Sequence, residues 1–102
     1  MTTITANEIK LRLDAGENLH LVDVREPGEH AEFNIGGTLL PLGNIQMMQI
    51  DDIDELKKEE VICYCRSGQR SMQASLMLET FGFTNVKNLV GGMLGWQEKF
   101  RG

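Results

Sequence analysis

Short apolar segments alternate with helix-like segments along this chain, and this alternation constrains the fold more than any other feature. The apolar segments are LHLVDV (19–24), VICY (61–64) and NVKNLV (85–90). A strand with almost no break in hydrophobicity is typical of a sheet that is covered on both faces. Because strands that alternate with helices form parallel sheets, the sequence predicts an α/β fold with a central parallel sheet and helices on both faces.

The helix-like segments carry recognisable end signals. Thr5 and Glu8 have the spacing of a capping box at the start of a predicted helix over about residues 6–15. Gly16 suits the left-handed residue that ends such a helix. The remaining expected elements are a short helix after Pro27, a short strand before Pro41, one or two short helices within 44–58, a helix from Ser71 to Phe81, and a terminal helix after Gly92.

The composition is typical of one soluble globular domain, which we expect to span residues 1–102. Apolar residues make up 41% of the chain and charged residues 25%. No stretch approaches the roughly 18 apolar residues that cross a membrane, and the polar start MTTITANEIK does not resemble a secretory signal. We therefore expect a cytoplasmic location. The net charge of −5 argues against a nucleic-acid or anionic-membrane surface, because both require basic patches.

Both cysteines of the chain, Cys63 and Cys65, lie in one Cys-x-Cys pair. They are too close along an extended strand to form an undistorted disulfide, so we expect free thiols in a reducing compartment. Zinc would need four ligands at suitable spacings, and the two histidines do not complete such a set. We therefore predict no metal and no cofactor. His30, on the short acidic helix, is expected to be solvated.

The stretch CYCRSGQRS (63–71) runs from the end of a strand into the start of a helix. Ligands bind at this edge in open α/β sheets. Cys65 lies at the strand end, and Ser67 and Gly68 permit a tight turn in which several N–H groups point inward and cradle an anion. Ser71 can donate its hydroxyl to the sulfur or cap the helix.

The surroundings of Cys65 favour an ionised nucleophile. A thiolate at a helix N-terminus is stabilised by the helix dipole, by unpaired N–H groups and by nearby arginines. Arg70 can close the loop or face a bound anion, whereas Arg66 is equally consistent with a solvated side chain and with a substrate contact. Cys63, in the middle of the strand, is interpreted as a buried small hydrophobic residue.

Together, the segments LVDVREPGEH, PLGNI, VICYCRSGQRSMQAS and NVKNLVGGMLGWQ resemble the rhodanese family in its single-domain form, over essentially the whole chain. The resemblance implies that Cys65 carries sulfane sulfur as a persulfide. The family positions whose N–H groups surround the persulfide correspond to Arg66, Ser67, Gly68, Gln69 and Arg70.

The resemblance also assigns positions outside the loop. The Asp-x-Arg of the first family motif corresponds to Asp23 and Arg25, which it places near the active-site edge in a mainly structural role. The closing motif corresponds to packing and turn residues, namely Leu89, Gly91, Gly92 and Trp96. The chain departs from the family pattern at NIGGT, where Asn34 replaces a common histidine and Thr38 an alanine.

The implied function is that of a thiosulfate sulfurtransferase, which moves sulfur from a small-molecule donor to a thiophilic acceptor or an acceptor protein. We expect a monomer without nucleic-acid or membrane partners. The alternatives are a cysteine-dependent phosphatase or arsenate reductase, and a sulfur-carrying or redox-sensing interaction module. The six-residue loop Cys65–Arg70 favours sulfur transfer, because related phosphatases use a loop one residue longer.

Overall fold

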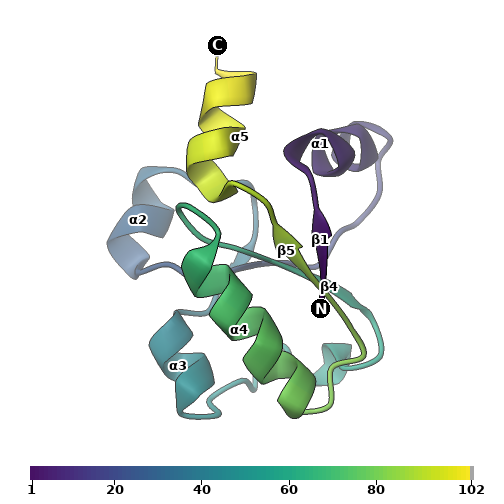
Figure 1. The fold of residues 1–102 in the computed structure, drawn as a ribbon, viewed down its shortest axis with the longest axis vertical. Helices are drawn as coiled ribbons and strands as arrows, with labels where there is room; N and C mark the ends of the chain where they lie inside the picture. The colour runs from purple at the N-terminus through teal and green to yellow at the C-terminus, as the bar shows by residue number, and fades with distance from the viewer. Residues whose placement is uncertain (102) are drawn as a thin grey trace.

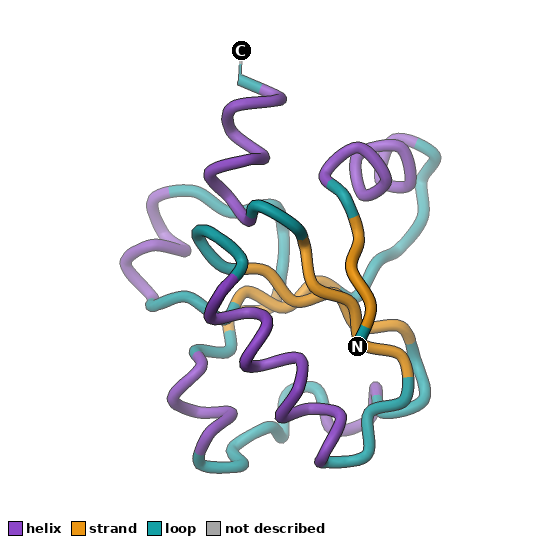
Figure 2. Tube along the Cα trace, in the orientation of Figure 1, coloured by secondary structure: helices purple, strands orange, loops and turns teal. Residues whose placement is uncertain are grey.

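The three apolar segments form the central strands of a parallel sheet (Figures 1 and 2). The computed structural model describes residues 1–101, and its central strands are β2 (Leu21–Asp23), β4 (Glu60–Tyr64) and β5 (Asn85–Leu89). Two short strands, β1 (Thr2–Ile4) and β3 (Thr38–Leu39), complete the order β1-β5-β4-β2-β3. All pairings are parallel, so the predicted fold class is confirmed.

Helices cover both faces of this sheet. Figure 1 shows α1 (Ala6–Asp14) and α5 (Gly92–Phe100) on one side, and α3 (Leu42–Gln46) and α4 (Gln69–Thr80) on the other. Helix α2 (Pro27–Glu32) follows β2, and a 3₁₀ turn at Asp54–Leu56 precedes β4. None of the helices within residues 1–101 is long and apolar enough to cross a membrane.

Alternate side chains of β4 enter two separate cores. Val61 and Cys63 belong to the cluster beneath α3 and α4, whereas Ile62 and Tyr64 belong to the cluster beneath α1 and α5. This alternation is the ordinary period of a strand. Cys65 continues it into the first cluster and is 1% exposed, so the sulfur-bearing side chain lies among buried groups.

The expected capping box fixes the start of α1. The Glu8 N–H donates to Thr5 Oγ1 at 3.1 Å, and the Thr5 N–H donates to Glu8 Oε1 at 3.4 Å. Gly16 has φ +85° just after the helix, as predicted. The sequence did not indicate strand β1, because three residues at a sheet edge carry no periodicity of their own.

Candidate active site

The loop between β4 and α4 places Cys65 where the central strands end. Strands β5 and β2 flank β4 on its two sides. Gly68 has φ +105° at the start of α4, a left-handed conformation that glycine adopts without strain. The predicted route from strand end to helix start is therefore confirmed.

Three hydrogen-bond donors surround the Cys65 sulfur. Sγ accepts from the Gly68 N–H at 3.0 Å, from the Ser71 N–H at 3.3 Å and from the Ser71 hydroxyl at 3.3 Å. Burial alone would raise the pKa of this thiol, but the hydrogen bonds from Ser71, Gly68 and Ser67 outweigh it and hold the pKa below its ordinary value. This arrangement stabilises the thiolate form of Cys65.

In the described part of the chain, the other loop residues Arg66, Gln69 and Arg70 contribute no hydrogen bond to the sulfur. Arg66, Ser67 and Gln69 are exposed, and Arg70 is partly buried. Within residues 1–101, no backbone N–H of Arg66, Gln69 or Arg70 makes a hydrogen bond to Sγ. Fewer N–H groups therefore donate to the Cys65 sulfur than the sequence suggested.

Arg70 points toward α2. Its two terminal nitrogens donate to the two carboxylate oxygens of Glu29 at 2.8 and 2.9 Å. This pair holds the pKa of Glu29 at about 2, below its ordinary value. Arg70 therefore links the cysteine loop to α2, and Glu29 is a site residue that the sequence did not reveal because the two lie 41 positions apart.

Asp23 and Arg25 form a buried pair at the end of β2. The Arg25 side chain donates to both Asp23 carboxylate oxygens, at 2.9 and 2.8 Å, and to the Phe33 carbonyl oxygen at 2.5 Å. Burial would raise the pKa of Asp23, but its hydrogen bonds from Arg25 and His30 lower it. The expected solvation of His30 is wrong, since its Nδ1 lies 2.8 Å from Asp23 Oδ2.

The first turn of α5 holds the backbone of the cysteine loop. The Met93 N–H donates to the Cys65 carbonyl at 2.9 Å, and the Leu94 N–H donates to the Arg66 carbonyl at 3.0 Å. A Cβ at Gly92 would lie 2.4 Å from the Cys65 oxygen. The glycine of the closing motif therefore permits a close approach of two backbones.

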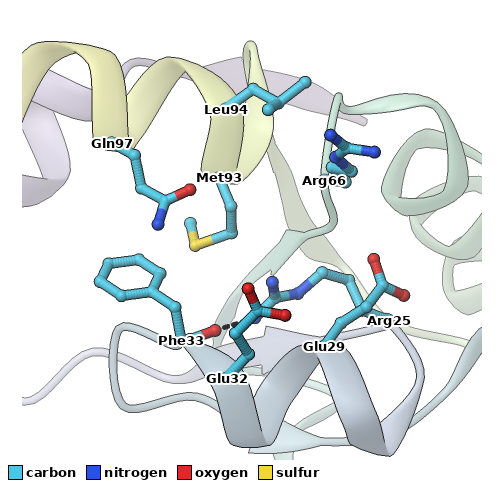
Figure 3. Close-up of a pocket in the computed structure, with 8 residues that line it drawn as sticks. All are labelled: Arg25, Glu29, Glu32, Phe33, Arg66, Met93, Leu94 and Gln97. Carbon is cyan, nitrogen blue, oxygen red and sulfur yellow. Dashed lines mark hydrogen bonds between the residues drawn. The ribbon is translucent and has the colours of Figure 1, made fainter.

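A cavity of about 360 Å³ opens beside the loop, between α2 and α5 (Figure 3). Figure 3 shows Arg66 at one end and Phe33 and Gln97 at the other, with acidic side chains of α2 along one wall. Its lining combines both signs of charge with apolar groups: Arg25, Glu29, Glu32, Phe33, Arg66, Met93, Leu94 and Gln97. The cavity gives a small charged molecule room next to the Arg66 side chain.

Asn88 is the second site residue that the sequence did not reveal. It lies on β5, is 4% exposed, and contacts both Ser71 and Gly68. A strand asparagine between Lys87 and Leu89 carries no local signal of such a contact. The two-residue period of a strand places Asn88 on the same face as the apolar Val86, and this is the hint in the sequence that its amide points inward.

The arrangement is suited to nucleophilic chemistry at sulfur. A thiolate stabilised by fixed N–H and O–H donors is ready to attack without a separate base. Cys63 differs, because burial raises its pKa to about 12. Both cysteines are free thiols, as expected, and within residues 1–101 no group of three His, Cys, Asp or Glu side chains could hold a metal ion.

Comparisons with known proteins agree with this geometry. The family model described as "Rhodanese-like domain" matches residues 5–99. A protein of Allochromatium vinosum named "Sulfurtransferase" is 38% identical over 95 residues, which cover 91% of this chain and 85% of that protein. Relatives differ in length, since this chain spans 51% of YrkF of Bacillus subtilis and 21% of the adenylyltransferase and sulfurtransferase MOCS3-1 of Zea mays.

Solved structures show the same fold. A rhodanese-like domain protein from Staphylococcus aureus has a TM-score of 0.83 at 31% identity and covers 94% of this chain and 91% of its own. The human single-domain sulfurtransferase TSTD1 has a TM-score of 0.82 at 24% identity, covering 98% of each chain, and at this identity supports the fold alone. The sheet order, the cysteine loop and the match over residues 5–99 together make this chain a member of the rhodanese-like domain family, as its sequence motifs suggested.

Proposed function

We propose that this protein is a thiosulfate sulfurtransferase that carries sulfane sulfur as a persulfide on Cys65. The observation that supports this most directly is the set of three donors around Sγ, from the Gly68 N–H, the Ser71 N–H and the Ser71 hydroxyl. These donors favour the thiolate that the reaction needs. The names of relatives such as the Allochromatium sulfurtransferase agree with sulfur transfer in general.

In the proposed reaction, the Cys65 thiolate attacks the outer sulfur of thiosulfate. A new S–S bond forms, the S–S bond of thiosulfate breaks, and its electron pair leaves on sulfite. One S–S bond replaces another and the transferred sulfur keeps its oxidation state, so no oxidant or reductant is needed. A thiophilic acceptor then attacks the outer sulfur of the persulfide and releases the Cys65 thiolate.

The loop residues have distinct proposed roles in this reaction. The N–H groups of the turn from Arg66 to Arg70 extend the cradle outward to the persulfide anion, one sulfur atom beyond Sγ. The exposed Arg66 attracts the anionic donor, and the adjacent cavity admits the donor and the acceptor, which is a small thiol or a protein. Asp23 and Arg25 hold the end of β2 behind the loop.

Two features favour sulfur over phosphate as the transferred group. The loop from Cys65 to Arg70 has six residues, which is short for a tetrahedral oxyanion. The guanidinium of Arg70 is engaged by both carboxylate oxygens of Glu29, whereas a phosphatase loop needs that charge directed at the phosphate. We further propose that the protein acts as a monomer in a reducing cytoplasm, in keeping with its two free thiols.

The test is intact-protein mass after treatment with thiosulfate in the absence of reductant. We expect the protein to gain the mass of one sulfur atom and to lose it again with cyanide. Cys65→Ala abolishes the gain, while the matched control Cys63→Ser keeps it. Hydrolysis of aryl phosphates without any persulfide adduct would refute the proposal and favour the phosphatase alternative.

A further inference from the structure

A buried amide on the neighbouring strand contacts the two residues that donate to Cys65. Asn88 lies on β5, next to β4 in the sheet, in register with Cys63. Its Nδ2 donates to the Gly68 carbonyl at 3.2 Å, and its Oδ1 accepts from the Ser71 hydroxyl. Since the side chain is 4% exposed, water does not replace these contacts.

The Ser71 hydroxyl has one proton and three acceptors within reach. They are Cys65 Sγ at 3.3 Å, the Gly68 carbonyl at 3.2 Å and Asn88 Oδ1. The Gly68 carbonyl already accepts from the Met72 N–H at 3.1 Å and from Asn88 Nδ2. The proton is therefore shared mainly between the Cys65 sulfur and the Asn88 amide oxygen.

The charge on sulfur decides which acceptor takes this proton. A thiolate is an anion, and hydrogen bonds to ionised acceptors are about twice as strong as neutral ones. When Cys65 carries a second sulfur, the negative charge lies on the outer atom and Sγ becomes a weak neutral acceptor. An amide oxygen then accepts the Ser71 proton better than Sγ does.

We propose that Asn88 is a positioning residue for sulfur transfer. Its amide oxygen accepts the hydrogen bond of the Ser71 hydroxyl when Cys65 carries sulfur. When Cys65 is a thiolate, the sulfur accepts that hydrogen bond instead. No covalent bond to Asn88 forms or breaks, because only the Ser71 hydroxyl rotates. This inference rests on the proposed persulfide chemistry, but the competition for the proton already exists in the sulfur-free protein.

The consequence is that Asn88 shifts the balance toward the sulfur-loaded state. If the Asn88 amide oxygen is removed, Sγ is the main acceptor of the Ser71 proton. The thiolate then becomes more stable relative to the persulfide. A merely structural role predicts the opposite, because a loosened loop would withdraw donors from Sγ and raise the pKa of Cys65. The other titratable groups that interact with Cys65 are Arg70 on α4 and Cys63 on β4.

The first experiment measures the alkylation rate of Cys65 against pH, in the sulfur-free protein with a Cys63→Ser background. We expect Asn88→Ala to lower the pKa of Cys65 by about half a unit. Asn88→Asp should raise it by about one unit, because a carboxylate retains the Ser71 proton and adds negative charge. The matched control Asn85→Asp, at the exposed start of the same strand, should leave it unchanged.

The second experiment equilibrates the protein with a fixed ratio of thiosulfate to sulfite and measures the persulfide-to-thiol ratio by intact mass. Asn88→Ala should lower this ratio about fivefold, and should have no further effect in a Ser71→Ala background. Leucine is close to asparagine in volume and has no polar side-chain atom, so we expect the same results from Asn88→Leu if Asn88→Ala does not fold.

Three results would overturn the role of Asn88. They are a raised or unchanged pKa of Cys65 in Asn88→Ala, an unchanged pKa in Asn88→Asp, and an effect on the persulfide ratio that persists in Ser71→Ala. Absence of any persulfide in the unmodified protein would instead refute the proposed function, while the alkylation experiment would still decide how the Ser71 proton is shared.

Discussion

Replacing Gly92 by alanine tests whether the close contact between α5 and the cysteine loop holds the active site together. Gly92 has φ +55°, and an added Cβ would lie 2.4 Å from the Cys65 oxygen and 2.5 Å from the Arg66 oxygen. These are backbone atoms, which cannot move aside as the end of a flexible side chain can. The loop and the first turn of α5 must therefore separate in the variant.

The expected loss of stability has three sources. A left-handed conformation costs a residue with a Cβ about 1 kcal/mol, and forced overpacking costs about 1 to 3 kcal/mol. Separation also weakens the hydrogen bonds from Met93 and Leu94 to the loop carbonyls, each worth about 1 kcal/mol. The free energy of unfolding should therefore fall by about 3 to 5 kcal/mol, a large part of the roughly 5 to 15 kcal/mol of a typical domain.

Urea unfolding measures this loss, and Gly43→Ala is the matched control. Gly43 lies in α3 with nothing within 4 Å of its added Cβ, so the control should be neutral or slightly stabilised. The melting temperature of Gly92→Ala should fall by at least about 12 °C, and alkylation of Cys65 at neutral pH should slow. If Gly92→Ala loses less than about 1 kcal/mol more stability than Gly43→Ala does, the close contact does not hold the site together.

Three further predictions concern charge. Glu60 accepts from two cations and has a pKa of about 2, below its ordinary value of 4.5. A carboxyl of this kind stabilises the fold above its ordinary pKa and loses that effect as pH falls through its folded pKa. Between pH 4.5 and 2, the unmodified protein should therefore lose more stability than Glu60→Gln. The urea midpoint at each pH measures this difference. Glu29→Gln frees the Arg70 guanidinium and should lower the pKa of Cys65, whereas Arg70→Ala should raise it, as measured by alkylation. The rate of sulfur uptake from thiosulfate should rise with pH and level off below the pKa of about 8.5 of a free thiol, measured by stopped reactions and intact mass.

Each of these predictions has a control or a contradicting result. Glu59→Gln alters an exposed neighbour and should leave the acid dependence of stability unchanged. Glu32 lies on the same helix as Glu29 but does not pair with Arg70, so Glu32→Gln should not change the alkylation of Cys65. A sulfur-uptake rate that still rises with pH well above 8.5 would show that the donors around the sulfur do not stabilise its thiolate.

The sequence predicted the parts of this molecule that depend on local pattern. Continuous apolar runs indicated the central strands, the Thr5–Glu8 spacing indicated the start of α1, and the glycine after Cys65 indicated the tight turn into α4. Each of these signals comes from residues that are close together in the chain, because capping, strand period and turn geometry are local properties.

The unpredicted parts depend on side chains brought together by the fold. Glu29 meets Arg70, and Asn88 meets Ser71, only after strands distant in sequence have paired. His30 was expected in water because it lies on an acidic helix, yet it contacts the buried Asp23 of the preceding strand. Polar contacts of this kind have no sequence period, so their partners could not be identified in advance.

The edges of the sheet have a consequence for how copies of this protein meet one another. Strand β1 has three residues and β3 has two, whereas the central strands β4 and β5 have five each. An exposed edge strand offers unpaired N–H and C=O groups on which another chain can add as a new strand, and short edge strands limit this templating. The sheet therefore keeps its long, aggregation-prone strands in the interior and presents only brief edges, which should resist amyloid-like joining even at high concentration.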